Sequence, residues 1–297
     1  MRVTLPMSIL LVTAMSLACT SRTGDAGRQE IKRIDGRYVS AGEVEEYVAS
    51  VMNRAGVMGL QMAVINDSHV VYEHEWGLRS RRSGLVPDRE TVFPGLSFSK
   101  PTFAYLVMQL VESGLLDLDR PLVEYLDRPI GEYPAWADVK DDARMREITA
   151  RRVLTHTTGW PNFRLEQEGG KLTFIYPPGE RFSYSGEGFH FLQLAVETVT
   201  GKPLDVLARE RVFVPLNISL TSYVWETSFE ANHVDGHTER QKRVKFRRTE
   251  EPSAAGSLLT TASEHAKLLV ALLNGERLSQ KSIDKILALK IAAVSRI

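Results

Sequence analysis

The sequence is poor in several features that mark large protein classes. Its 297 residues contain one cysteine, Cys19, so a disulfide within the chain is excluded. The 37 basic and 37 acidic residues cancel, so no overall field attracts nucleic acid or an anionic membrane. The seven histidines show no spacing of zinc ligands, and strand alternation would place His69 and His74 of HVVYEH on opposite faces. We therefore expect no nucleic-acid partner, and no metal or organic cofactor.

The remaining composition is that of a globular protein. Hydrophobic residues make up 43% and charged residues 25% of the chain, which suffices for one large domain or two small ones. The sequence contains no internal repeats. The one basic run, ERQKRVKFRR at residues 239–248, has no aromatic or glycine-rich segment beside it. We interpret this run as a solvated strand or loop.

The first residues predict export. Arg2 precedes an apolar run at residues 5–18, which is too short to span a bilayer and has the length of a signal-peptide core. Ser16 and Ala18 are small residues at the positions a signal peptidase reads, so we expect residues 1–18 to be a signal peptide. Residues 19–36 are polar and without apolar periodicity, and we expect them to form a tether.

The position of Cys19 directly after this run predicts a lipid-modified N-terminus. Such a group would anchor the protein to a membrane of the bacterial periplasm or cell envelope. Ser16 departs from the pattern, because it stands where such signals usually carry leucine. Secretion with a free Cys19 is the alternative.

Apolar periodicity and capping signals predict the elements of one domain at residues 37–297. Ser40 and Glu43 form a capping box for an amphipathic helix over residues 41–55. Residues 60–65 and 69–76 predict the two arms of a β-hairpin. Short helices and loops follow up to about residue 250. Later helices are expected at residues 189–200, from near Pro203, after a cap at Thr261 or Ser263, and from Ser279 to about Lys290.

The stretch LSFSKP places Ser97 three residues before Lys100. A Ser-x-x-Lys spacing is common by chance, and Ser282 and Lys285 in SIDK repeat it. The SIDK pair lies inside a terminal helix beside Asp284, and we interpret it as a solvated segment on the helix surface.

The context of Ser97 differs, because a helix is predicted to begin there. An apolar stripe runs over residues 103–111, and Gly114 can end the helix. Pro101 falls in the first turn, where proline is tolerated. Unpaired amide groups at a helix N-terminus can stabilise an oxyanion formed by reaction of Ser97. Lys100 lies one turn later on the same face and could act as a base if burial or nearby positive charge lowered its pKa.

Five segments in order resemble the serine β-lactamase and penicillin-binding-protein superfamily. The branch that they resemble is the class C β-lactamase-like one, which includes D-Ala-D-Ala carboxypeptidases and esterases. The resemblance runs from about residue 58 to residue 278 and includes ITARRVLTHTTGWPNF, PPGERFSYSGEGF and AAGSLLTTASEHAKLLVALLNG. It implies an α+β fold of β-lactamase/transpeptidase type, in which helices flank an antiparallel sheet beside a mostly helical region. It further implies that Ser97 is the nucleophile, Lys100 its partner and Tyr184 a second general base or acid.

Two departures from the family pattern bear on activity. The Tyr-x-Asn motif of the family is here Tyr184-Ser185-Gly186, and glycine has no amide to orient a lysine or a substrate. The third motif, Lys-Thr-Gly or His-x-Gly on a late strand, occurs nowhere before the chain reaches Ile297. We therefore expect an incomplete domain that lacks the late strands and keeps one hairpin. The loss of one oxyanion donor typically lowers a rate by about 10²–10³-fold.

These observations support two hypotheses of different classes. The first is an exported serine hydrolase that acts by acyl transfer on a β-lactam, a D-Ala-D-Ala peptide or a small ester. The second is a catalytically inactive cell-envelope protein that binds peptide or peptidoglycan. A zinc hydrolase is a weaker third possibility, because the histidine spacing does not favour it.

Overall fold

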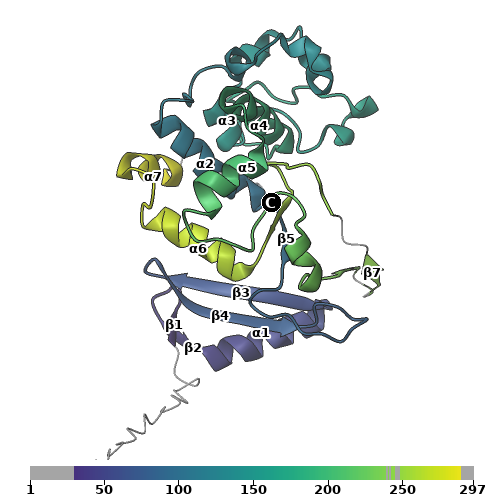
Figure 1. Ribbon diagram of the computed structural model, residues 1–297, viewed down its shortest axis with the longest axis vertical. Coiled ribbons are helices and arrows are strands. Elements are labelled where there is room, and N and C mark those ends of the chain that lie inside the picture. The colour runs from purple at the N-terminus through teal and green to yellow at the C-terminus, as the bar shows by residue number, and fades with distance from the viewer. Residues whose placement is uncertain (1–29, 239, 241, 245–247, 289–297) are drawn as a thin grey trace, which may run out of the picture.

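A computed structural model describes residues 30–238, 240, 242–244 and 248–288 (Figure 1). The expected signal peptide, Cys19 and most of the expected tether lie outside the described residues. The tether prediction is wrong for residues 30–36. There Glu30–Lys32 forms strand β1, which pairs with β2 (Tyr38–Ser40) and buries Ile31. Within the described ranges, no helix combines the length and apolar character needed to cross a bilayer.

The first helix is held at both ends by local signals. Helix α1 spans Ala41–Ala55. The Ser40 hydroxyl accepts the N–H of Glu43, and the Glu43 carboxylate accepts the N–H of Ser40 at 2.9 Å. Gly56 adopts the left-handed conformation at φ 65° and ends the helix. These contacts confirm the predicted capping box.

Strands β3 (Gly59–Asn66) and β4 (His69–Gly77) pair antiparallel, which confirms the predicted hairpin. Figure 1 shows the hairpin between α1 on one side and α6 (Ala262–Leu273) on the other. On the α6 side, the Gln61 side chain accepts the N–H of Ala262 at 3.0 Å. The first layer of the fold is therefore a small sheet covered by a helix on each side.

Two further strand pairs show that the expectation of a single hairpin is wrong. Strand β5 (Phe93–Leu96) pairs antiparallel with β8 (Leu258–Thr260), and β6 (Gly236–His237) pairs with β7 (Arg243–Val244). Strands of two to four residues are too short to show alternation in the sequence. The exposed β7 belongs to the basic run, of which residues 239, 241 and 245–247 lie outside the described residues.

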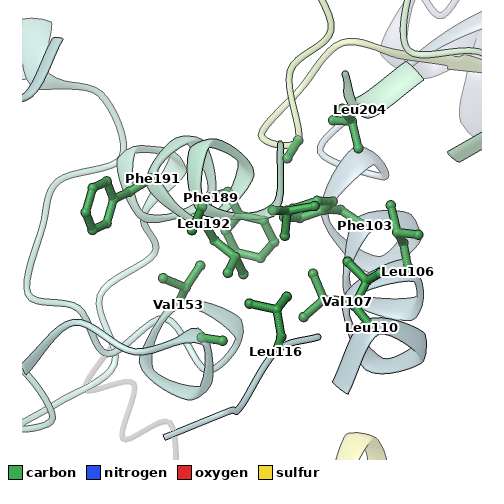
Figure 2. Packing of buried hydrophobic residues seen from close by; sticks show 14 of the residues in the cluster. Phe103, Leu106, Val107, Leu110, Leu116, Val153, Phe189, Phe191, Leu192 and Leu204 are labelled. Carbon is green, nitrogen blue, oxygen red and sulfur yellow. The ribbon is translucent and has the colours of Figure 1, made fainter. Parts of the chain in front are cut away.

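The main apolar cluster includes the facing sides of two long helices beyond the hairpin. Helix α2 (Ser99–Glu112) packs Phe103 and Leu106 into the same buried cluster as Phe189 and Leu192 of α4 (Gly186–Thr200) (Figure 2). Full burial of such a side chain stabilises the fold by about 1.5–3 kcal/mol. Short helices connect and surround this pair: α3 (Ala150–Leu154), α5 (Leu204–Ala208), a π-helical turn (Arg209–Phe213), and 3₁₀ turns at Leu122–Tyr125, Ile130–Glu132, Pro134–Val139, Ala143–Glu147, Arg164–Glu166, Glu168–Gly170 and Thr227–Ala231.

The last described helix, α7 (Gln280–Leu287), is capped by Ser279 as predicted, and Lys290 lies outside the described residues. The interpretation of Ser282 as a solvated residue is wrong, because its relative exposure is 4%. Two contacts explain this. The N–H of Ser279 donates to the Glu112 carboxylate of α2 at 2.8 Å, and Ile283 enters the main core. Docking on α2 therefore covers a helix face that looks polar in the sequence.

Candidate active site

Ser97 lies in the tight turn that joins β5 to α2. The Ser97 side chain is exposed, whereas Ser99 and Lys100 are buried. The Ser99 hydroxyl donates to the carbonyl of Leu96 at 2.6 Å and accepts the N–H of Leu258 at 2.9 Å. Ser99 therefore ties the turn to β8, and Ser97 is the hydroxyl left facing solvent.

Lys100 is the buried centre of the site. Its Nζ lies 3.3 Å from Ser97 Oγ and donates to the Ala255 carbonyl at 2.5 Å. The same nitrogen is 4.7 Å from the ring centre of Tyr184 and 5.6 Å from that of Phe189. A lysine held against two aromatic faces and a carbonyl has few rotamers, so the distance to Ser97 is fixed by contacts on several sides.

Tyr184 stands just before helix α4, whose N-cap is Ser185. The Tyr184 side chain is 39% exposed. Burial alone would raise the pKa of Tyr184, but hydrogen bonding to Lys100 and Ser97, together with the charge of Lys100, outweighs burial and lowers this pKa below its usual value. A phenol whose pKa is lowered exchanges protons with a neighbouring hydroxyl more readily at neutral pH. The structure thus brings together all three residues singled out in the sequence.

Asn162 packs against Gly186, which stands at the position where the family motif has asparagine. The Gly186 N–H donates to both the backbone carbonyl and the side-chain Oδ1 of Asn162, each at 3.1 Å. A Cβ on Gly186 would lie 2.8 Å from the Asn162 carbonyl oxygen, so only glycine allows this close approach. The carboxamide of Asn162 therefore sits beside the motif, although it comes from another segment.

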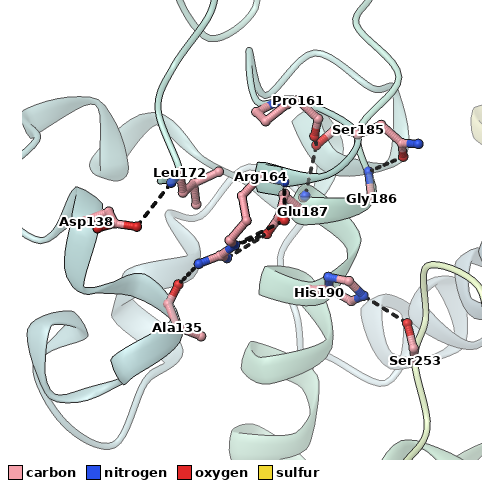
Figure 3. Close-up of polar contacts among 12 residues, drawn as sticks. Ala135, Asp138, Pro161, Arg164, Leu172, Ser185, Gly186, Glu187, His190 and Ser253 are labelled. Atoms are coloured by element: carbon pink, nitrogen blue, oxygen red, sulfur yellow. Dashed lines mark hydrogen bonds and ion pairs between the residues drawn. The ribbon is translucent and has the colours of Figure 1, made fainter. Parts of the chain in front are cut away.

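A cavity of about 990 Å³ opens beside Ser97. Its walls include a polar strip in which His190 Nε2 contacts Ser253 Oγ at 2.9 Å (Figure 3). In the same strip Gln193 contacts the loop at residues 252–254. Burial lowers the pKa of His190, so its imidazole is neutral at neutral pH. The cavity is lined by Ser97, Trp136, Asn162, Phe163, His190 and Gln193, among others.

An ion pair braces the same wall of the cavity. Arg164 binds the Glu187 carboxylate of α4 through two guanidinium nitrogens, at 2.6 and 3.1 Å (Figure 3). Glu187 is 4% exposed. The Arg164 guanidinium also donates to the carbonyl of Ala135, so one side chain joins three segments. This clamp holds the Asn162 loop against the start of α4.

A model of the Beta-lactamase family matches residues 44–292. The chain belongs to this family. The α+β fold expected from the sequence is confirmed by a similar solved structure, that of the D-alanine carboxypeptidase AmpC from Burkholderia cenocepacia. That structure superposes with a TM-score of 0.67 at 21% identity, over 82% of this chain and 67% of the other.

Two similar proteins align with a smaller part of this chain. Penicillin-binding protein 4 from Amycolatopsis lactamdurans is 32% identical over 175 residues, which are 54% of this chain and 44% of that protein. A D-aminopeptidase from Brucella anthropi is 29% identical over 205 residues, 66% of this chain and 39% of that protein. The chain thus spans less than half the length of either relative.

Some parts of the family site cannot be traced in this chain. The sequence contains no Lys-Thr-Gly and no His-x-Gly. Among the residues that the structure describes, no group of three His, Cys, Asp or Glu side chains gathers in a way that could hold a metal ion.

Two groups of the site were not predicted from the sequence, the Ala255 carbonyl that binds Lys100 and the Asn162 side chain beside Gly186. A backbone carbonyl leaves no signal in the sequence, whereas the unusual Gly186 was a signal that another group fills its place.

Proposed function

We propose that this protein is an exported serine hydrolase that acts by acyl transfer. Ser97 is the nucleophile, and Lys100 and Tyr184 move its proton. The observation that carries the proposal is the contact of Ser97 Oγ with the buried Lys100 Nζ at 3.3 Å, beside a tyrosine whose pKa is lowered. An exposed serine with a buried amine at hydrogen-bond distance is the arrangement that an activated nucleophile requires.

The reaction follows from this geometry. Ser97 Oγ forms a bond to the substrate carbonyl carbon, and its proton passes to the free amine of Lys100 or to the phenolate of Tyr184. The oxyanion is stabilised by backbone N–H groups at the N-terminus of α2. Collapse of the tetrahedral intermediate breaks the bond to the leaving group, which takes up the transferred proton. Water then attacks the acyl-serine and loses a proton to the same groups. These groups return the proton to Ser97 Oγ as the acyl bond breaks and the acid leaves.

The substrate class is a β-lactam, a D-Ala-D-Ala peptide or a small ester. Support comes from the named relatives, a penicillin-binding protein and a D-aminopeptidase, and from the size of the cavity beside Ser97. All three candidates present a carbonyl to a serine. They differ in the leaving group, so competition between them for Ser97 separates the classes.

The test is labelling of the purified protein with a fluorophosphonate probe and with a fluorescent penicillin. We expect labelling of wild type and none of Ser97→Ala. Ser282→Ala is the matched control, because Ser282 has the same spacing to a lysine but is buried on α7. Equal labelling of wild type and Ser97→Ala would remove Ser97 from the reaction. Unlabelled β-lactam, D-Ala-D-Ala peptide and ester, added as competitors, then identify the substrate class.

One specific observation favours the second candidate, a catalytically inactive cell-envelope protein that binds peptide or peptidoglycan. Position 186, where the family motif has asparagine, is glycine in this chain, so no side-chain amide is available there to orient Lys100 or a substrate. This function predicts sedimentation with purified peptidoglycan that is equal for wild type and Ser97→Ala. It also predicts a folded wild type that no serine probe labels.

Export and lipidation at Cys19 form part of the proposal and rest on the sequence of residues 1–19. Expression of the full chain in a bacterium should place the protein in the envelope fraction. Cys19→Ala should shift it to the soluble periplasmic fraction if a lipid is attached there. If wild type and Cys19→Ala distribute equally between the fractions, Cys19 carries no lipid anchor, and secretion with a free Cys19 is the remaining interpretation.

A further inference from the structure

The HTTG turn at residues 156–159 is tied to the backbone on both sides of Tyr184. The His156 carbonyl accepts the N–H of Ser183 at 2.7 Å, and the His156 ring accepts the N–H of Ser185 on Nδ1 at 3.1 Å. The residues before and after Tyr184 are therefore both bonded to one histidine. This fixes the direction in which the tyrosine side chain leaves the backbone.

The His156 ring also supports the tyrosine ring directly. The two ring centres are 4.4 Å apart with planes at 27°, which is a stacked arrangement. The rings of Phe182 and Phe189 lie 5.6 and 5.2 Å from the same imidazole. The imidazole is thus packed between aromatic neighbours, and Tyr184 cannot turn on this side without displacing it.

The protonation state of His156 matches this role. Nδ1 can accept the Ser185 N–H only when that nitrogen carries no proton. Burial, and then the charge of Lys100, lower the pKa of His156 to about 4. At neutral pH the ring is therefore neutral, and Nδ1 is available as an acceptor.

The turn itself is built to hold the segment that leads to Tyr184. The carbonyls of Thr157 and Gly159 accept the N–H groups of Gly179 and Ile175 at 2.7 and 2.8 Å. His156 has φ 55°, a left-handed conformation that residues with a side chain seldom adopt. Such a conformation persists only where surrounding contacts enforce it.

We propose that His156 is the positioning residue for Tyr184, holding its phenol within reach of Ser97 and Lys100. This inference rests on the proposed acyl-transfer function, because it gives His156 a role only through Tyr184. His156 itself touches no substrate in the proposal. Misplacement of a reacting group by about 1 Å can lower a rate on the order of 10²-fold. The position of the Tyr184 phenol should therefore affect the rate at which Ser97 is acylated.

The first test measures the rate of Ser97 labelling by a fluorophosphonate in a double-mutant cycle. We expect His156→Ala to slow labelling on the order of 10²-fold in the wild-type background, and to have little further effect in Tyr184→Phe. His156→Asn should recover part of the rate, because asparagine tolerates a left-handed φ and its Oδ1 can accept the Ser185 N–H. An equal loss in both backgrounds would show a general structural role and overturn the proposal.

The second test does not need a reactive enzyme. Incorporated 3-fluorotyrosine, with the Tyr184 resonance assigned from Tyr184→Phe, reports the ionisation of this phenol by ¹⁹F NMR. In wild type the pKa of Tyr184 should lie below that of an exposed tyrosine. His156→Ala should raise this pKa as the phenol leaves Lys100 and Ser97, and His156→Asn should raise it less. An unchanged titration in folded variants refutes the positioning role. A wild type that titrates as expected but is not labelled refutes acyl transfer instead, so the two failures are distinguishable.

Discussion

Lys100 donates a hydrogen bond from Nζ to the carbonyl of Ala255 at 2.5 Å, across 155 residues of sequence. The donor lies in the first turn of α2, and the acceptor lies in the loop before β8. Since the same nitrogen contacts Ser97, the position of this loop sets where the amine stands relative to the nucleophile. The site therefore depends on a loop that is distant from Ser97 in the sequence.

Gln193 of α4 is the side chain that fixes this loop most directly. Its Nε2 donates to the Pro252 carbonyl at 3.0 Å, and its Oε1 accepts the N–H of Ala254 at 2.8 Å. We predict that Gln193→Leu lowers the free energy of unfolding by about 1–3 kcal/mol, because buried backbone groups lose their partners. We further expect labelling of Ser97 to slow, because the Ala255 carbonyl is no longer held under Lys100.

Urea unfolding and the labelling rate of the folded fraction measure the two effects separately. Gln280→Ala is the control, since Gln280 is exposed on α7 and donates to the neighbouring Asp284 of the same helix. It should change neither quantity. A Gln193→Leu protein with lower stability but an unchanged labelling rate would show that the loop does not set the position of Lys100.

Restoring the family asparagine should harm this protein rather than improve it. A side chain at Gly186 would place its Cβ 2.8 Å from the Asn162 carbonyl oxygen. We predict that Gly186→Asn costs about 1–3 kcal/mol of stability, as overpacking usually does. Gly42→Ala on the first turn of α1 is the matched control, because a Cβ there meets no atom within 4 Å. Urea midpoints that fall equally for both variants would contradict the close approach.

Local signals in the sequence predicted what local contacts determine. The capping box at Ser40, the hairpin and the cap at Ser279 are formed by residues a few positions apart, and all are confirmed. Of the two caps predicted for the helix after residue 260, Thr261 and Ser263, the structure has Thr261. The pairing of β5 with β8 was not predictable, because it joins four residues near Pro94 to three residues more than 160 positions later. The burial of Ser282 likewise depends on a neighbour, Glu112, that the sequence alone does not place beside it.

The candidate site divides in the same way. The placement of Ser97 and Lys100 follows from one helical turn, and Tyr184 could be singled out only through the resemblance to a family. The groups that hold these residues come from tertiary structure: a carbonyl at Ala255 and an imidazole at His156. Neither contributes through an unusual spacing, so the structure was needed to find them.

The Arg164–Glu187 pair should be important for stability because its carboxylate is almost fully buried. We predict that Arg164→Met lowers the free energy of unfolding by about 3 kcal/mol, since it leaves an uncompensated buried charge. Arg181→Met is the matched control. Its partner is the neighbouring Glu180, and both side chains are about half exposed, so the loss should be within about 1 kcal/mol. Chemical denaturation at neutral pH measures both, and equal small losses would show that the clamp is dispensable.

Stability should also fall in a defined pH window because two histidines are held neutral. Burial lowers the pKa of His265 from its usual value near 6.5 to about 4, and burial together with Lys100 does the same for His156. Between these pH values the unfolded chain binds protons that the folded protein does not, so the free energy of unfolding rises with pH. The contribution of the two histidines to stability is therefore lost as pH falls from about 6.5 to about 4.

The His265 ring stacks on the Phe98 ring, and the two ring centres are 4.5 Å apart. His265→Phe tests this pH window, because phenylalanine can keep the stacking while it removes the group that binds the proton. We expect the urea midpoint of this variant to fall less steeply between pH 6.5 and pH 4 than that of wild type. Carboxylates whose pKa is lowered, such as Asp119, lose their contribution mainly below this range and are shared by both proteins. Identical slopes for the two proteins would mean that His265 titrates normally, and that its stack on Phe98 does not exclude the protonated form.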